Sequence, residues 1–210
     1  MKHISFDMEG TLIDHGYSEH IWGTDIPRLY AEKHGVDLEE ARRRVFHEYD
    51  QVGDARPEWY DVGYWFRRLG LPGDWMELPE RRRDLIRVYP DAKIALDALV
   101  SEHSLVVSSN TIRELLEVQV EEVGDYFTHV FSAPSDYRSV KKDQRFYRRI
   151  IEVLGIEPTE MIHVGDHYTY DYLAAQSIGV EAYHLDRTGK TRGEDTLGSL
   201  TEFMERLKKA

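Results

Sequence analysis

The sequence predicts an α/β protein with a Rossmann-like core, in which a parallel sheet of five strands carries an inserted α-helical cap domain. Short apolar runs bounded by turn residues recur along the chain, and amphipathic helical patterns separate the later runs. Strands that alternate with helices pair in parallel, so this order predicts a single parallel sheet. One long interval with helical patterns and no convincing strand predicts the insertion.

The five predicted strands are apolar runs that are short enough to be buried. They lie at residues 2–6, 104–108, 128–132, 161–164 and 180–185. The clearest helix stands between the third and fourth runs, where Phe146, Ile150 and Leu154 recur every four residues. Gly179 is expected to end the helix before the fifth strand. Because strands joined by helices run parallel, their carboxyl ends are expected at the same edge of the sheet.

Residues 15–89 are interpreted as the helical cap domain, and residues 1–14 and 90–210 as the Rossmann-like core domain. All four tryptophans of the chain lie in the cap interval. A small helical domain needs large side chains for its own core, so most of its aromatic residues are expected to be buried there. The segment from Trp59 to Tyr64 is expected to face a substrate, and Gly16 and Pro90 lie near the expected hinges.

Composition excludes several classes of function. The 210 residues include 27 basic and 39 acidic side chains, a net charge of -12, which argues against nucleic acid and against an anionic membrane as partners. No apolar run approaches the roughly 20 residues of a membrane span. The chain has no cysteine, which excludes a thiol nucleophile. No signal-peptide pattern follows Lys2, so a cytoplasmic location is expected, as a monomer or a homodimer.

Polar residues follow the first two predicted strands. Asp7 and Glu9 come directly after the first strand, and Gly10 behind them lets backbone approach an anion closely. The second strand ends in Ser109 and Asn110, which offer a hydroxyl and an amide. Taken alone, a carboxylate pair at a strand end stabilises a turn as often as it forms part of a functional site.

Two lysines and two further acids complete the set. Lys141 and Lys142 precede a helix that starts near Asp143, and Asp166 and Asp171 follow the fourth strand in the spacing GDxxxxD. Open parallel sheets bind ligands beyond the carboxyl ends of their strands, where all of these residues fall. The topology therefore predicts that they converge on one site.

The order and spacing of these motifs resemble the haloacid dehalogenase superfamily of phosphohydrolases, over essentially the whole chain. The family also carries a helical cap between its first two motifs, at the position of residues 15–89. The first motif of the family usually reads DxDGT and is Asp7-Met8-Glu9-Gly10-Thr11 here, and the second, an apolar strand ending in Ser/Thr-Asn, is Val106-Val107-Ser108-Ser109-Asn110. The third, a lysine followed by Pro-Asp, is Val140-Lys141-Lys142-Asp143, and the fourth, GDxxxxD, runs from Gly165 to Asp171.

The resemblance implies a Mg²⁺-dependent phosphatase that hydrolyses a small-molecule phosphate monoester through an aspartyl-phosphate intermediate. Asp7 would be the nucleophile and Glu9 the general acid and base. The magnesium ion would be held by Asp7, Asp166 and the backbone carbonyl of Glu9, with Asp171 behind them orienting water or a lysine.

The same resemblance assigns the groups that would bind the phosphate. Lys141 and the Ser109 hydroxyl would hold the oxygens of the transferring phosphoryl group, assisted by Asn110 and the first-motif loop. The loop residues concerned are Met8, Gly10 and Thr11.

Two departures from the family pattern bear on these roles. Glu9 stands where aspartate is usual and reaches one methylene further, as in the enolase-phosphatase branch, which is similar in reading DxEGT; acid/base chemistry is favoured over a structural role. Lys142 stands where proline is usual, which leaves two lysines as candidates, and the register before Asp143 favours Lys141. His163 is expected to pack within its strand rather than to bind a metal with His167.

Three other functions stay open. A phosphomutase of the same superfamily would return the phosphoryl group to another hydroxyl, and a 2-haloacid dehalogenase would use Asp7 to attack carbon. A non-catalytic phospho-accepting module would keep the phosphate on Asp7, as receiver domains also place acids, a hydroxyl and a lysine on a parallel sheet. The large insertion and Glu9 argue against the last of these.

Overall fold

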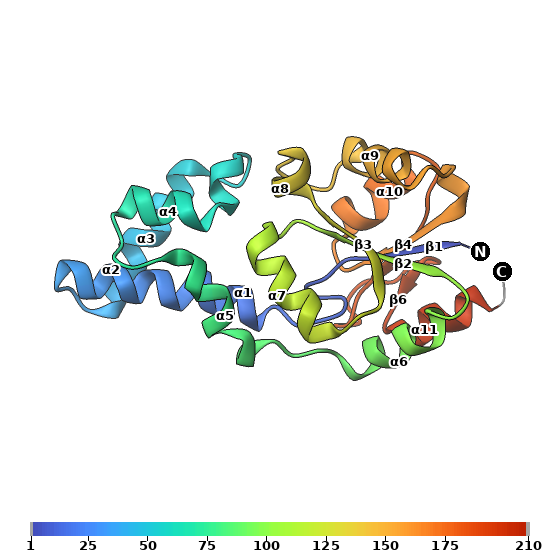
Figure 1. Ribbon diagram of the computed structural model, residues 1–210, viewed down its shortest axis with the longest axis horizontal. Coiled ribbons are helices and arrows are strands. Elements are labelled where there is room, and N and C mark those ends of the chain that lie inside the picture. The colour runs from blue at the N-terminus through green and yellow to red at the C-terminus, as the bar shows by residue number, and fades with distance from the viewer. Residues whose placement is uncertain (1, 209–210) are drawn as a thin grey trace.

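The computed structural model describes residues 2–208 and places a parallel sheet at the centre of the core (Figure 1). Among these residues the sheet has six strands in the order β3-β2-β1-β4-β5-β6, each parallel to its neighbours. The strands are β1 (His3–Phe6), β2 (Ser104–Ser109), β3 (Phe127–Ser132), β4 (Met161–Gly165), β5 (Glu181–Leu185) and β6 (Thr196–Leu197).

The α/β class and the five expected strands are confirmed, and the strand count is corrected by one. The additional strand, β6, has two residues and pairs with β5 through Leu185 and Leu197. A pair of residues is too short to show a period in the sequence. The strand order reverses at β1, which has β2 on one side and β4 on the other, and such a reversal opens a crevice beyond the strand ends.

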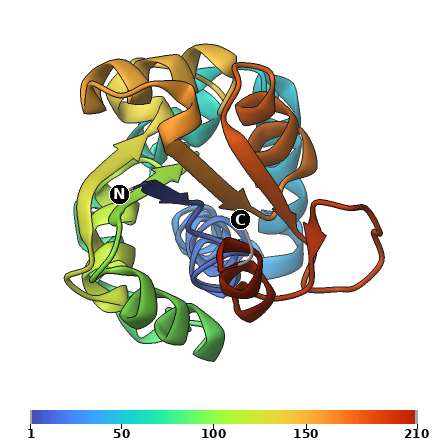
Figure 2. The ribbon, with the colours of Figure 1, turned by 90° about the vertical axis from the view of Figure 1, so that its right-hand side faces the viewer.

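Helices cover both faces of the sheet (Figures 1 and 2). Successive side chains of a strand point to opposite faces, so each strand contributes residues to both layers of packing. Ile4 and Phe6 pack with helices α6 (Pro90–Leu99), α7 (Arg113–Val123) and α11 (Leu200–Leu207). The opposite face packs against α9 (Gln144–Leu154) and α10 (Ala174–Gln176). Asp143 caps α9 by accepting from the backbone N–H of Phe146, 3.0 Å away, so the expected start of this helix is confirmed.

Residues 16–85 contain helices and no strand, and they form the lobe drawn in blue to green on the left of Figure 1. Residues 15–89, which include this stretch and the residues on either side of it, are called the helical segment below. The division of the chain into cap and core domains stays a prediction. The elements are α1 (Gly16–His20), the π-helical turn η1 (Ile21–Asp25), α2 (Ile26–His34), α3 (Leu38–Val52), η2 (Pro57–Tyr60), α4 (Val62–Leu69), η3 (Trp75–Glu77), α5 (Leu78–Arg81) and η4 (Arg83–Leu85).

The two connections between the helical segment and the sheet run side by side. Ile13 and Val88 form an antiparallel bridge, and the backbone N–H of Asp14 donates to the carbonyl of Arg87 at 3.0 Å. The helical segment also packs α5 against α7 of the core. The remaining elements are α8 (Ala133–Tyr137), η5 (Pro158–Glu160) and the π-helical turn η6 (Tyr168–Leu173). No helix within residues 2–208 is long and apolar enough to cross a bilayer.

Candidate active site

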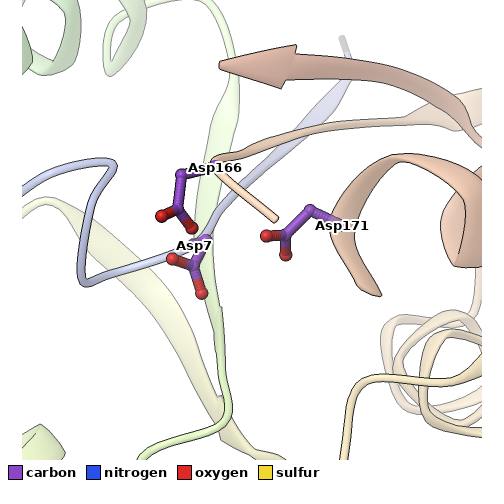
Figure 3. Close-up of side chains that lie close together, drawn as sticks. All are labelled: Asp7, Asp166 and Asp171. Atoms are coloured by element: carbon purple, nitrogen blue, oxygen red, sulfur yellow. The ribbon is translucent and has the colours of Figure 1, made fainter. Parts of the chain in front are cut away.

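Three carboxylates meet at the carboxyl edge of the sheet (Figure 3). Asp7 directly follows β1, Asp166 directly follows β4, and Asp171 comes from η6. One oxygen from each lies within 4.8 Å of the others. The backbone N–H of Asp7 donates to the carbonyl of Val164 at 3.0 Å, which extends the β1–β4 ladder and places the first carboxylate beside the second. The predicted convergence of these three acids is therefore observed.

Lys142 lies among these acids and is buried, with 1% of its side chain exposed. Its Nζ donates to Asp7 Oδ1 and contacts Asp171 Oδ1, and it also donates to the carbonyl of Ser108 at 3.2 Å. Burial opposes the charge, but Asp171 and Asp7 hold the pKa of Lys142 above its ordinary value. The site therefore contains a desolvated cation next to Asp7.

The structure corrects the placement expected for Lys141. Its Nζ is 2.7 Å from Asp54 Oδ2 of the helical segment and 4.8 Å from the centre of the Tyr170 ring, and it forms no ion pair with Asp7, Asp166 or Asp171. The backbone N–H of Lys142 donates to Asn110 Oδ1 at 2.9 Å, which anchors this residue next to the strand ends. That anchor directs the second lysine, not the first, to Asp7.

Asp171 is held by the protein through both of its oxygens. Oδ1 is 3.0 Å from His163 Nε2, and Oδ2 accepts from the backbone N–H of His167 at 2.9 Å. Burial raises the pKa of a carboxyl group, but Lys142 and His163 together keep the pKa of Asp171 well below its ordinary value. Both oxygens of Asp171 are thus engaged by the protein, and its expected role in orienting its neighbours stays a prediction.

His163 packs within β4 as expected, and it also carries a polar contact chain. Its Nδ1 is 2.9 Å from Ser5 Oγ, which is 2.7 Å from Ser108 Oγ on the neighbouring strand. Burial lowers the pKa of His163. Because a carboxylate oxygen can only accept, Nε2 is the donor in the contact with Asp171. This buried chain fixes the orientation of Asp171 from inside the sheet.

Glu9 is held by two side chains that belong to none of the four sequence motifs. Ser18 Oγ of α1 and Gln119 Nε2 of α7 both donate to Glu9 Oε1, the second at 2.6 Å. Burial raises the pKa of Glu9 to about 7. The sequence interpretation missed both partners because they are 9 and 110 residues away from Glu9 and lie on helices of ordinary pattern. Oε1 is thus anchored, and Oε2 has no hydrogen-bond partner within residues 2–208.

The loop after β1 is shaped by Gly10, which has a φ of +78°. A Cβ at this position would lie 2.2 Å from Asp166 Oδ2, so only glycine fits against the acid. Arg187 holds the loop from behind by donating to the carbonyls of Gly10 at 3.2 Å and Thr11 at 2.7 Å. The Met8 side chain is fully buried, so only its backbone can contribute to binding.

The other predicted phosphate ligands stand at the same edge. Thr11 Oγ1 is buried and has no hydrogen-bond partner within residues 2–208. Ser109 ends β2, next to β1, and its Oγ accepts from the backbone N–H of Thr111 at 3.1 Å. The Ser109 hydroxyl donates to no other residue that the structure describes, so it can donate to an anion.

The donor set fits a small hard cation. Asp7 and Asp166 offer carboxylate oxygens, and the backbone carbonyl of Glu9 accepts no hydrogen bond from any described residue. An all-oxygen set with few protein ligands suits Mg²⁺, which keeps several waters. His15 of the helical segment stands 3.4 Å from Asp166 Oδ2, and this contact raises the pKa of His15 to about 9.

A cavity of about 350 Å³ opens beside Glu9, between the core and the helical segment. Its core wall includes Asn110 and Ile112, and its other wall includes Ser18, Trp59 and Tyr60. Two residues of the segment expected to face a substrate do line it. The cavity volume is within the usual range for a small-molecule site, about 300 to 1,000 Å³.

Comparisons with known proteins identify the family of the chain. A family model described as haloacid dehalogenase-like hydrolase matches residues 1–179. The chain is 28% identical over 181 residues to the GMP/IMP nucleotidase YrfG of Escherichia coli (strain K12), covering 82% of this chain and 78% of the relative. It is 22% identical over 237 residues to the glyceraldehyde 3-phosphate phosphatase of Pyrococcus furiosus, covering 100% of this chain and 94% of the relative.

A solved structure gives a close match to the fold. The HAD phosphatase of Thermococcus onnurineus superposes with a TM-score of 0.84 at 27% identity, covering 99% of this chain and 98% of that one. The superposition spans the sheet and the helical segment together, because nearly all of both chains is included.

Proposed function

The chain belongs to the haloacid dehalogenase-like hydrolase family and is a hydrolase of phosphate esters, and on this premise we propose that it dephosphorylates a small-molecule monoester through a covalent intermediate on Asp7. One observation carries the proposal. A buried carboxylate at the end of the central strand lies against the buried Lys142, with the anchored carboxyl group of Glu9 on the same loop. Such a set supplies a nucleophile, a charge clamp and a proton donor.

Each side chain has a distinct task in the proposed reaction. An oxygen of Asp7 attacks phosphorus, and the bond between phosphorus and the leaving oxygen breaks while Glu9 gives that oxygen a proton. Glu9 then takes a proton from water, which attacks phosphorus and frees Asp7 and inorganic phosphate. Lys142, in the role that sequence register assigned to Lys141, stabilises the charge of the phosphoryl oxygens.

We propose Asp7, Asp166 and the carbonyl of Glu9 as the ligands of a magnesium ion. When bound there, the ion would hold the Asp7 carboxylate ionised and offset the negative charge of the phosphate. Asp171, whose oxygens are occupied, would orient Lys142 instead. Ser109, Asn110 and the backbone of Met8 and Gly10 are proposed to receive the phosphate oxygens.

The test is release of inorganic phosphate from a panel of sugar phosphates, phosphoglycolate and nucleotides, with Mg²⁺ present. The Asp7→Asn variant should release none, because an amide is not a nucleophile toward phosphorus. Acid quenching of the wild-type reaction should trap phosphate on the protein, and Glu9→Gln should trap more of it or stall before it. Phosphate release by Asp7→Asn at the wild-type rate would overturn the proposal.

The same assays decide between this proposal and its alternatives. A phosphomutase would move the phosphoryl group to a second hydroxyl without stoichiometric phosphate release. A dehalogenase would release halide from a 2-haloacid without metal. A phospho-accepting module would keep phosphate on Asp7 for many minutes with Mg²⁺ present. The two named relatives act on different substrates, so their names support phosphate-ester hydrolysis without selecting one ester.

A further inference from the structure

A groove of about 1,110 Å³ lies between α8 and α9, which stand next to each other along the upper edge of the molecule in Figure 1. Residues 133–154, which contain both helices, carry six basic and three acidic side chains, whereas the whole chain has a net charge of -12. The basic residues that line the groove are Arg138, Lys141, Arg145, Arg148 and Arg149. A concave basic surface on an acidic protein attracts anions.

Three of these arginines have no acidic partner. Arg138, Arg145 and Arg148 are exposed and form no ion pair with any residue in 2–208, whereas Arg149 pairs with Glu152 at 2.8 Å. Most arginines elsewhere in the described chain do pair with a carboxylate. The groove therefore gathers guanidinium groups that are free to bind a ligand.

The charges on α9 stand in the reverse of the order that stabilises a helix. Cations are favoured near the carboxyl end of a helix and anions near its amino end. Arg145 lies in the first turn of α9 and Arg148 and Arg149 in the second, whereas Glu152 lies in the last turn. Arg145 is also three and four residues from like charges, which repel it. The stability of the helix therefore does not account for these arginines.

Arg138 occupies a backbone position that usually belongs to glycine. It directly follows α8 and has a φ of +51°, the only positive φ of a non-glycine residue in the part of the chain that the structure describes. Glycine or asparagine is common at the end of a helix, because a Cβ makes this left-handed conformation costly. An arginine without an acidic partner at such a position indicates a role for its side chain.

The shape of the groove fits a segment of extended chain better than a compact anion. Its lining follows α9 from Arg145 to Val153, which is about 12 Å along the helix axis. Four residues of extended chain span about 13 Å. Val153 is 56% exposed and lies eight residues after Arg145 on the same side of the helix, so the groove also offers an apolar contact. A duplex or a membrane surface would also face the acidic remainder of the molecule, which would repel it.

We propose that the groove between α8 and α9 binds an acidic segment of a partner protein in an extended conformation. Carboxylates of the segment pair with Arg138, Arg145 and Arg148, and an apolar side chain of the segment packs on Val153. Arginine clusters are a general means of recognising acidic motifs, because each guanidinium group can hold a carboxylate through two hydrogen bonds. This role goes beyond the proposed catalytic function and does not depend on it.

Fluorescence anisotropy of a labelled eight-residue peptide of alternating glutamate and leucine, titrated with the full chain, measures binding. An extended peptide of this kind presents its carboxylates on one side. Saturable binding that weakens with added salt is expected. Arg145→Gln and Arg148→Gln should each raise Kd about fivefold, because each removes a charge-assisted hydrogen bond. Arg28→Gln on α2 is the matched control, since it removes an exposed arginine that forms no ion pair within residues 2–208 and changes the net charge equally. It should leave Kd unchanged.

Three binding results would overturn the proposal. The first is the absence of saturable peptide binding. The second is a Kd that Arg28→Gln raises as much as Arg145→Gln does, because net charge alone would then explain the binding. The third is tighter binding of tripolyphosphate than of the peptide, measured by calorimetry, because a compact anion would then be the better ligand.

Thermal denaturation of the same variants tests the argument from the order of charges. Arg145→Gln and Arg148→Gln should each be at least as stable as the wild type, because each removes a cation that is unfavourable in the first half of α9. A melting temperature lowered by several degrees in both variants would assign these arginines a structural role and refute the inference of a partner.

Discussion

Replacing Lys142 with methionine tests which of two neighbouring lysines belongs to the site. Methionine keeps most of the volume of the side chain and removes its charge. Lys142 and Asp171 are each 1% exposed, and Asp7 is 8% exposed, so the substitution leaves buried carboxylates without their cation. The matched variant, Lys141→Met, removes a cation that is 24% exposed and paired with an acid that is 63% exposed.

The expected loss of stability is calculated for one buried carboxylate that has lost its cation. It becomes protonated in the folded variant, and keeping a carboxyl group of ordinary pKa near 3.9 protonated at pH 7 costs about 4 kcal/mol. This agrees with the roughly 3 to 5 kcal/mol typical of breaking a buried ion pair. The folded variant then binds a proton that the unfolded chain lacks, so the loss should shrink as pH falls, to about 1.5 kcal/mol at pH 5. Lys141→Met should cost less than about 1 kcal/mol.

Urea denaturation with a chelator present measures the free energy of unfolding at both pH values. Phosphate release measures activity, which Lys142→Met should reduce at least about a hundredfold and Lys141→Met only slightly. The reasoning fails if Lys142→Met is as stable as Lys141→Met at pH 7. It fails also if the activity loss belongs to Lys141→Met.

Three further results are expected. Gln119→Leu removes the 2.6 Å hydrogen bond to Glu9 and should lower kcat about tenfold with little change in KM, whereas a purely structural role would change stability and leave kcat per folded molecule unaltered. His163→Leu takes away the Nε2–H donor of Asp171 and should cost about 1 to 3 kcal/mol in thermal denaturation, while the exposed His129→Leu should cost less than about 0.5 kcal/mol. Chelation with EDTA should abolish phosphate release without altering the far-ultraviolet circular dichroism, and added Mg²⁺ should restore it; metal-independent turnover would contradict the ligand assignment of Asp7 and Asp166.

Much of the site was predictable because the sheet is parallel. The carboxyl ends of β1, β2 and β4 lie at one edge, so residues that directly follow these strands meet there whatever the details of packing. Asp7, Asp166 and Asn110 are of this kind. Their positions depend on the strand periodicity alone, which is a local property of the chain.

Lys141 and Lys142 show where such local reasoning ends. Both precede the same helix and have the same chemistry, so one step of register decides which side chain reaches Asp7. That step is set by the hydrogen bond from the Lys142 backbone to Asn110, which joins residues 32 positions apart. No periodicity within the loop encodes that contact.

By itself the sequence determined the α/β class, the five longer strands and the acids at their ends. Each of these follows from the local spacing of apolar residues and from the turn residues that bound each strand. The fold alone decided the two hydrogen-bond donors of Glu9, the two-residue strand β6 and the position of Trp22 at the cavity. Those features depend on side chains brought together from distant parts of the chain. Their energies come from burial and from pairing of polar groups, and neither exists until the chain is packed.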